Sequence, residues 1–326
     1  MTVEESVPVS APPVPVRASH KRGILSGRFW RRNGLLYLML LPGLIHLVVF
    51  KYAPLFGLII AFQKYSPFQG VTGSQWVGLH NFSRVFHDDY ILTLLKNTFL
   101  LAAFTMLVTF VVPIVFAVLL NEVRNRYLKK TVQTLSFLPY FISSAVLVSI
   151  FYTLLSPQGG LVNQIIRSAG GQPIFFLADP DWFRPLYVTL SVWQTFGYST
   201  IIYIAAMTTI DSSLYEACEI DGGGRWKKMF HVTLPGISNM MIILFILNIG
   251  QILSVDVEKV LLMYSPGVYS TADVVQTYVY RLAFAPNGFP DYSYGAAVGI
   301  IQAIIALVMI WAANRAAKRF SDSRLF

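Results

Sequence analysis

Long apolar stretches alternate with short polar ones along this chain. A helix that crosses a bilayer needs about 20 largely apolar residues, and runs of that kind lie near 34–53, 97–120, 133–155, 185–210, 236–254 and 292–313. Lipid offers no water to backbone amides and carbonyls, so we expect these runs to be helical. The pattern predicts an all-α integral membrane protein with six transmembrane helices. Pro42, Lys51 and Pro54 predict a kink in the first span.

The composition agrees with a lipid-exposed surface. Of the 326 residues, 55% are hydrophobic and only 13% are charged, whereas soluble domains carry about 25% charged residues. The first twenty residues lack the basic, apolar and small-residue order of a secretory signal. We therefore expect residues 1–30 to form a disordered cytoplasmic tail. A membrane domain over 31–320 and a cytoplasmic end at 321–326 follow it.

Lysine and arginine set the predicted orientation, because cytoplasmic loops of membrane proteins are enriched in both. If the N-terminus is inside, the cytoplasmic segments hold 17 of the 25 basic residues. Both termini and the segment 211–235 are then cytoplasmic. The charge of +9 is explained by topology, and no basic face predicts nucleic-acid binding.

The segment 211–235 is a charged, triple-glycine interruption between two uncharged apolar runs. Ser213 and Glu216 fit a capping box at the start of a short helix, and Gly222 fits its left-handed end. Residues 225–232 read as a second short helix, and Pro235 suits the first turn of the fifth span. Physics alone leaves two interpretations open: a docking element for a partner, or an ordinary connector lying at the lipid headgroups.

The first short helix has one apolar face of small reach. Leu214, Ala217 and Cys218 lie at helical spacing on that face. Glu216 and Glu219 lie beside it, where they could meet a basic partner. Cys218 is the single cysteine, which excludes an internal disulfide.

The string E-A-C-x3-G-x9-V-x-L-P resembles the EAA signature of permease subunits of binding-protein-dependent ABC importers. Cys218 replaces the second alanine of that signature and Val232 replaces its isoleucine, and the other positions match at the same spacing: Glu216, Ala217, Gly222, Leu234 and Pro235. The stretches LLPGLIHLVVFKYAPLFGLIIAFQKY and FLPYFISSAVLVSIFYTLLSPQGGLVN resemble the sugar-importing branch. VEKVLLMYSPGVYSTADVVQTYVYRLAF is similar to permeases for oligo- and polysaccharide fragments.

The resemblance implies a type I ABC importer permease fold in a bacterial cytoplasmic (inner) membrane, with 211–235 as a coupling helix that docks on a cytoplasmic ATPase. The residues expected to couple are Glu216, Ala217, Cys218, Glu219, Asp221, Gly222 and Pro235. The implied partners are a second permease, different but related, an ATPase dimer, an extracytoplasmic binding protein, an oligosaccharide and membrane lipid. The chain has no G-x-x-x-x-G-K-[ST] motif. We therefore expect it to be no enzyme and to carry no cofactor, with ATP and Mg²⁺ on the ATPase.

Two alternatives remain. An ion-coupled secondary carrier generally places acids near the bilayer midplane, and the central parts of the six runs contain no Asp or Glu. A membrane scaffold without transport would have no ATPase partner.

A sugar needs hydrogen-bonding side chains for its hydroxyls and aromatic rings for its C–H faces. Spans three to five supply both kinds, and the residues expected to line a path are Tyr140, Ser144, Trp193, Gln194, Tyr198, Asn248 and Gln251. Arg184, Lys259 and Arg281 near the outer mouth are compatible with an anionic sugar. The sequence leaves open whether residues 257–264 end span five or form a partly inserted segment.

Overall fold

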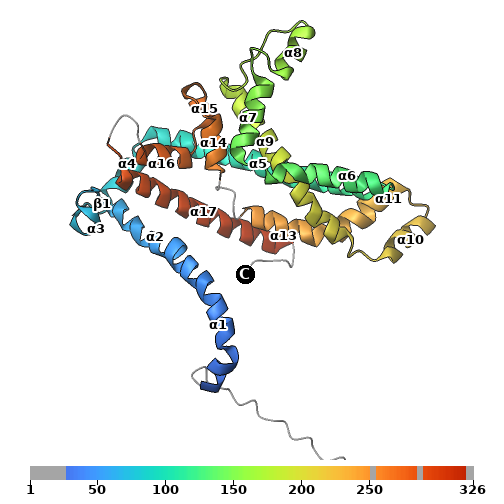
Figure 1. Cartoon of the computed structure of the whole chain (residues 1–326), viewed down its shortest axis with the longest axis horizontal. Helices are drawn as coiled ribbons and strands as arrows, with labels where there is room; N and C mark the ends of the chain where they lie inside the picture. Colours follow the sequence, from blue (N-terminus) through green and yellow to red (C-terminus); the bar gives the residue numbers. More distant parts are fainter. Residues whose placement is uncertain (1–26, 250–254, 285–288, 321–326) are drawn as a thin grey trace, which may run out of the picture. The chain divides into compact units, whose positions relative to one another are not determined.

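The computed structural model describes residues 27–249, 255–284 and 289–320, and most of them are helical (Figure 1). The predicted all-α fold is confirmed. Within the described ranges the only strands are β1 (Gln63–Lys64) and β2 (Gln75–Trp76), which pair antiparallel. The chain forms two compact units, Met1–Gly57 and Leu58–Phe326.

The described part of the first unit, residues 27–57, is a helical stretch that contains Pro42 and Pro54. α1 (Gly27–Leu47) contains Pro42, a π-helical turn follows at Val48–Tyr52, and α2 is Ala53–Phe56. A 3-10 turn at Gly57–Phe62 then leads into the second unit. Proline has no N–H to donate to the preceding turn, and the wide π turn ends two residues before Pro54. The predicted irregularity of the first span therefore lies at 48–52.

The second unit is built from helices of very different lengths, and its longest are α5 (Asp89–Asn121), α9 (Pro180–Met207) and α17 (Tyr292–Phe320). The medium helices are α4 (His80–Phe86), α6 (Arg126–Phe137), α7 (Ser144–Leu155), α8 (Leu161–Ser168), α10 (Ser212–Ile220), α13 (Ser238–Ile249), α14 (Val257–Met263) and α16 (Val275–Ala283). The short elements are α3 (Gly70–Gly73), η3 (Leu138–Phe141), α11 (Arg225–Lys228), η4 (Met229–Thr233), α12 (Leu234–Gly236), η5 (Pro266–Val268) and α15 (Tyr269–Ala272).

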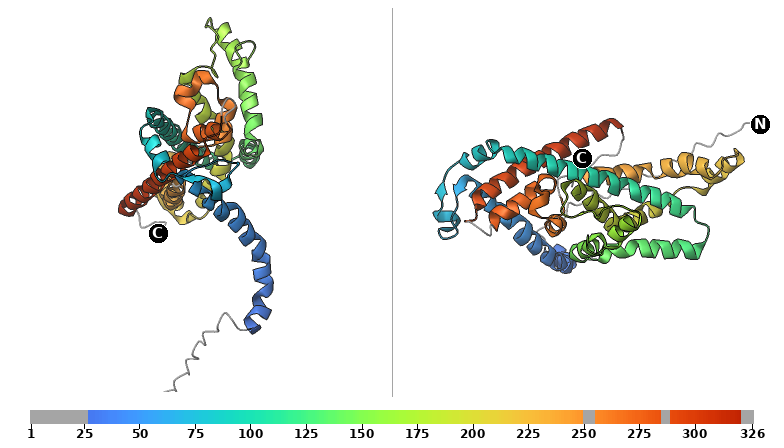
Figure 2. Two further views of the ribbon diagram at one scale, coloured as in Figure 1. Left: turned by 90° about the vertical axis from the view of Figure 1, so that its left-hand side faces the viewer. Right: turned by 90° about the horizontal axis from the view of Figure 1, so that it is seen from above.

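α5 and α9 pack side by side and run in the same direction. Arg184 Nη2 donates to Asn97 Oδ1 at 2.8 Å, and Thr200 Oγ1 donates to the Pro113 carbonyl at 3.5 Å. Both pairs are 87 residues apart in sequence, which requires a parallel register. The C-terminal ends of the two helices therefore lie at the same end of the unit. There the chain turns at 122–125 and α6 runs back (Figure 2).

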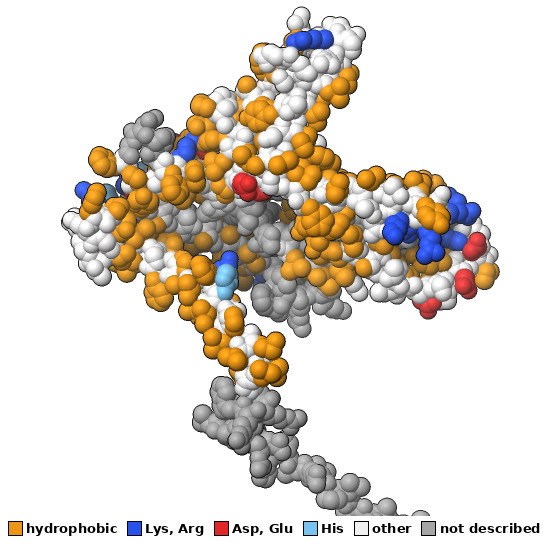
Figure 3. All heavy atoms as spheres, viewed as in Figure 1, with side chains coloured by type: hydrophobic (Ala, Val, Ile, Leu, Met, Phe, Trp, Pro, Cys, Tyr) orange, Lys and Arg blue, Asp and Glu red, His pale blue; other side chains and the backbone are white. Residues whose placement is uncertain are grey.

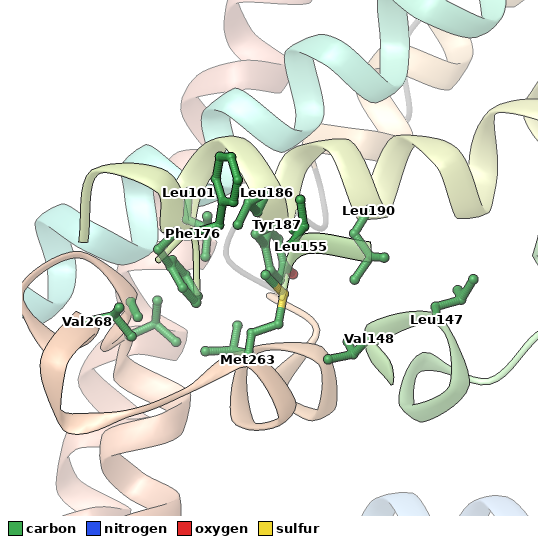
Figure 4. Packing of buried hydrophobic residues seen from close by; sticks show 14 residues of the cluster. Leu101, Leu147, Val148, Leu155, Phe176, Leu186, Tyr187, Leu190, Met263 and Val268 are labelled. Atoms are coloured by element: carbon green, nitrogen blue, oxygen red, sulfur yellow. The ribbon is translucent and has the colours of Figure 1, made fainter. Parts of the chain in front are cut away.

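Three buried clusters hold the second unit together. The outer cluster joins α7, α9 and α14 through Leu147, Leu190 and Met263 (Figure 4). A second cluster joins the start of α5 to α16 and α17. The third, called here the inner cluster, joins the C-terminal halves of α5 and α9 to η4 through residues such as Ile114, Tyr203 and Met229.

The described residues include three helical stretches long and apolar enough to cross a membrane, namely Gly34–Phe62, Asp89–Asn121 and Tyr292–Ala312. The number rises to five if each of two bent helix pairs is one span. The predicted run 185–210 corresponds to α9, which has 28 residues. α9 is not among the three stretches named above, and the polar residues Ser191, Gln194 and Thr195 lie along its middle.

The runs 133–155 and 236–254 are not single straight helices. The chain bends by 105° between Arg126–Phe141 and Ser144–Leu155, because Ile142 and Ser143 are extended. The Ser143 side chain then accepts a hydrogen bond from the Val146 amide and so begins α7. Helix Arg225–Gly236 bends by 57° into Ser238–Ile249, and residues 250–254 lie outside the described part.

Candidate functional site

The polar segment between α9 and α13 folds as a helix, a tight turn and a second helix. α10 begins after Asp211, whose side chain accepts from the Ser213 amide at 2.9 Å. The predicted capping box at Ser213 and Glu216 is therefore wrong, since Ser213 already lies inside the helix. Asp211 takes the cap because it is the residue in the extended conformation that a cap requires. The hydrogen bond from Ser213 holds the pKa of the Asp211 carboxyl below its usual range.

The turn after α10 uses two glycines for different reasons. Gly222 has φ +71°, the left-handed conformation predicted for it. The Gly223 amide donates to the Cys218 carbonyl at 2.7 Å and the Gly222 amide to the Glu219 carbonyl at 3.0 Å, which is the Schellman pattern at a helix end. A Cβ on Gly223 would lie 2.5 Å from the Cys218 carbonyl oxygen. The first glycine supplies a conformation and the second supplies room.

Several side chains on the outer surface of this segment are exposed in the part of the chain that the structure describes. Leu214 and Trp226 are exposed, and Ile220 is 86% exposed. Glu219 pairs with Lys228 at 2.9 Å, whereas Glu216 is exposed and has no ion pair or side-chain hydrogen bond within the described residues. Acidic and basic side chains gather at this end of the visible face, while apolar side chains cover much of the rest (Figure 3). The segment presents a mixed polar and apolar surface suited to another protein.

The base of the same segment is anchored firmly. Met229 and Val232 in η4 are buried, and Met229 packs in the inner cluster with α5 and α9. The Tyr215 hydroxyl lies 3.1 Å from Thr233 Oγ1 and so ties α10 to η4. Pro235 follows in α12 and is exposed. The turn thus projects from a buried base at the shared end of α5 and α9.

A cavity of about 540 Å³ lies between α5, η3, α9, α13 and α14. Four of the residues predicted to line a path face it together: Tyr140, Gln194, Tyr198 and Asn248. Its remaining wall is formed by Thr105, Thr109, Phe110, Tyr187, Ser191, Thr195, Ser199, Ile202, Tyr203, Leu244, Asp256 and Lys259. Such a volume is within the usual range of small-ligand sites.

The bend between η3 and α7 places an aromatic platform in this cavity. Tyr140 stacks on Tyr198 with ring centroids 4.4 Å apart and planes at 8°. Gln194 Nε2 donates to the Ile142 carbonyl at 3.1 Å, which ties the bend to α9. Pro139 and the paired serines after it signal a break in the sequence, but composition alone predicted one helix across them.

Two of the other predicted path residues lie outside the cavity wall, and the third is not among the described residues. Trp193 packs against the outer cluster and near Phe151, Ser144 is the first residue of α7 and is not part of the cavity wall, and Gln251 lies outside the described residues. Thr105 and Thr109 line the cavity but were not among the predicted residues. They are four residues apart on α5 and therefore on one face of it, a spacing that could have revealed them.

The three cations considered for an anionic sugar have different surroundings. Lys259 is 4% exposed and belongs to the cavity wall, where its ammonium lies 3.4 Å from Asp256 Oδ2 and 3.3 Å from Ser191 Oγ. Arg184 instead donates to Asn97. Arg281 contacts the buried Asp273 at 2.5 Å. Only Lys259 of these three lines the cavity.

A second polar cluster, called here the outer brace, centres on Asp273, which is fully buried. Its carboxylate accepts from Tyr90, Tyr264, Thr277 and Arg281 at 2.5 to 2.7 Å. Burial lowers the pKa of Arg281, but the charges of Asp273 and Tyr264 outweigh burial and raise it. The brace fastens the loop between α14 and α16 to the start of α5. Among the described residues, no group of three or more His, Cys, Asp or Glu side chains could hold a metal ion.

Comparison with known proteins gives concordant matches. Residues 111–322 match the family described as binding-protein-dependent transport system inner membrane component. The chain is 45% identical over 291 residues to the polygalacturonan/rhamnogalacturonan transport system permease protein YteP of Bacillus subtilis (strain 168), covering 89% of this chain and 90% of that one. It is 40% identical to Protein LplB of the same strain, with 91% and 92% covered.

Solved structures agree with the sequence relatives. A chain of a bacterial alginate ABC transporter, crystallised with an alginate pentasaccharide-bound periplasmic protein, matches with a TM-score of 0.82 and 35% identity. The match covers 91% of this chain and 99% of that one. A further structure of a bacterial ABC transporter, involved in the import of the acidic polysaccharide alginate, matches with a TM-score of 0.82 and 36% identity, covering 90% and 99%.

Proposed function

This chain belongs to the family of binding-protein-dependent transport system inner membrane components, and we propose that it is the permease subunit of an ABC importer of oligosaccharides. The observation that carries the proposal is the projecting segment 211–235. It has a rigid base and a surface with unpaired polar and apolar groups. Such a surface needs a partner to bury it.

The partner that fits the segment is an ATPase subunit on the cytoplasmic side. Glu216 and the exposed face of α10 dock in its groove, and the glycine turn fixes the angle of entry. Ala217, Cys218, Glu219, Asp221, Gly222 and Pro235 complete the docking segment. This chain carries no cofactor of its own; ATP and Mg²⁺ bind to an ATPase dimer. A second, related permease completes the membrane pathway, and an extracytoplasmic binding protein delivers the sugar.

The parallel packing of α5 and α9 supports the orientation that we propose for the chain. Their C-terminal ends lie together, and the segments that follow them contain the basic residues Arg124, Arg126, Arg225 and Lys227. Both segments therefore face the same side, and the excess of basic residues makes that side the cytoplasm. Both chain termini lie on this side in the bacterial inner membrane.

The cargo is an oligosaccharide derived from an acidic polysaccharide. The relatives named above include a permease for polygalacturonan or rhamnogalacturonan and an importer of alginate. The cavity has the groups a sugar needs, since the stacked pair Tyr140 and Tyr198 offers ring faces while Gln194 and Asn248 offer amides.

The test is purification and reconstitution. The transporter is purified through a tag on this chain, placed in proteoliposomes with ATP inside, and supplied outside with its binding protein and trigalacturonate. We expect an ATPase to co-purify and uptake to require ATP. Charge reversal at Glu216 should lower sugar-stimulated ATP hydrolysis more than Glu219→Gln does, because Glu219 is already paired with Lys228.

Other outcomes would contradict the proposal. Uptake driven by a proton or sodium gradient without ATP would indicate a secondary carrier. Recovery of no ATPase together with no uptake would indicate a scaffold.

A further inference from the structure

Lys259 is a buried cation in the wall of the cavity. It lies on α14, and its Nζ has two polar contacts within the described residues, with Asp256 and Ser191. The Tyr187 ring lies 5.7 Å from the ammonium. A buried ammonium must be compensated by charge or by hydrogen bonds.

Asp256 and Ser191 do not exhaust the hydrogen-bonding capacity of the Lys259 ammonium. An ammonium has three donors, and both contacts, at 3.4 and 3.3 Å, are longer than the usual 2.7 to 3.2 Å of a hydrogen bond from nitrogen. The Asp256 side chain is 42% exposed. Arg281 offers a contrast, since its carboxylate partner Asp273 is fully buried and the contact is 2.5 Å. Lys259 is therefore held loosely and Arg281 tightly.

Asp256 has a second anchor that does not depend on the ammonium. Its Oδ1 caps α14 by accepting from the Lys259 backbone amide at 3.2 Å, and its own amide donates to the Tyr187 hydroxyl at 3.2 Å. The Asp256 carboxylate can therefore stay in place as the cap of α14 when the Lys259 ammonium turns to another anion.

We propose that Lys259 is a carboxylate-binding subsite of the cavity, at which a carboxylate of the sugar takes the place of Asp256 as the partner of the ammonium. The inference rests on the proposed function and adds to it the residue that recognises the acidic cargo. Ser191 stays bonded to the ammonium and orients it toward the cavity. Without cargo, Asp256 neutralises the ammonium, so the empty cavity keeps no unpaired charge there.

The experiment compares four variants in proteoliposomes that contain the complete transporter, its binding protein and trigalacturonate. Lys259→Gln removes the charge and Lys259→Arg keeps it. Lys96→Gln is the matched control, because Lys96 does not line the cavity. Asp256→Asn removes the competing carboxylate but keeps a residue that caps helices well.

We expect Lys259→Gln to lower the uptake rate about tenfold to a hundredfold, as for the loss of a hydrogen bond to a charged group. Lys259→Arg should retain most of the rate, and Lys96→Gln should match the wild type. Asp256→Asn should raise the uptake rate when the loaded binding protein is limiting. If the pair of Lys259 and Asp256 were purely structural, Asp256→Asn would instead lower the uptake rate, because it breaks the pair just as Lys259→Gln does.

Two results overturn the subsite while leaving the importer intact. One is wild-type uptake by Lys259→Gln at equal amounts of transporter. The other is a loss of uptake in Asp256→Asn that parallels the loss in Lys259→Gln. A wild-type transporter that takes up no trigalacturonate but takes up xylotriose would overturn the acidic cargo and the subsite together.

Discussion

Two of the polar regions that interrupt this apolar chain use their charged residues in different ways. In the docking segment 211–235, α10 has no buried residue and Glu216 is exposed. In the outer brace, Asp273 is fully buried and accepts four hydrogen bonds from its own chain. The first region keeps Glu216 unpaired within the described residues while Glu219 pairs with Lys228 at the surface, and the second region uses its charges to hold its own loop in place.

The difference shows what distinguishes a docking element from a brace. Both regions are rich in polar residues in the sequence, and both follow an apolar span. A charge compensated within the chain restricts movement, because separating it from its partner exposes a buried ion. An uncompensated charge on an exposed helix costs little until a partner arrives. Mutations should therefore affect stability in the brace and coupling in the docking segment.

The largest effect is expected at Asp273. Asp273→Asn leaves Arg281 without its carboxylate in a half-buried site, and breaking a buried pair in this way costs about 3–5 kcal/mol of stability. Thermal unfolding of the detergent-purified protein measures the loss. The matched control is Asp291→Asn, which breaks the exposed pair with Arg84 and should cost about 1 kcal/mol or less. Equal shifts for the two variants would remove the contrast between a brace and a surface pair.

A smaller effect on stability but a complete effect on function is expected at Gly222. Gly222→Val places a branched residue at φ +71°, a strain of about 1–2 kcal/mol. The variant should remain in the membrane and lose sugar-stimulated ATP hydrolysis. Gly224→Ala is the control, because Gly224 has φ −73° and a Cβ at that position would meet no atom within 4 Å. Normal stimulated hydrolysis in Gly222→Val would contradict the coupling role.

The smallest effect is expected at Asp211. Asp211→Ala removes the cap of α10 and should reduce stimulated hydrolysis slightly, whereas Asp211→Asn keeps a capping side chain and should act as wild type. The pKa of Asp211 is lowered in the folded chain, so its contribution is fully present above the unfolded pKa and is lost as the pH falls through the folded value. Wild type and Asp211→Ala should therefore differ at neutral pH and converge in strong acid, as measured by the unfolding midpoint at each pH.

The local fold of the segment 211–235 was predicted well because its signals are local. The left-handed glycine, the helix before it and the helix after it depend on residues close to each other in the chain. The cap was misplaced by two residues, since Asp211 and Ser213 are both good caps and the choice between them depends on how the chain leaves α9.

The cavity was predicted only in part, because its walls come from distant segments. Gln194 and Asn248 were recognised by the cost of an amide within a span, and both line the cavity. Thr105 joins them only through the packing of α5 on α9, and Lys259 only through the packing of α14 on α7 and α9. The outer brace was not predicted at all, since Tyr90 and Asp273 are 183 residues apart.

α5 and α9 pack in parallel along their length and form one helix pair. One end of the helix pair packs against the base of the docking segment, and at the other end Arg184 donates a hydrogen bond to Asn97 beside the outer brace. The cavity lies along the length of the pair. The base of that segment, the cavity and the hydrogen bond between Arg184 and Asn97 are therefore all attached to the same pair of helices, so none of them can shift without a change in the packing of α5 or α9.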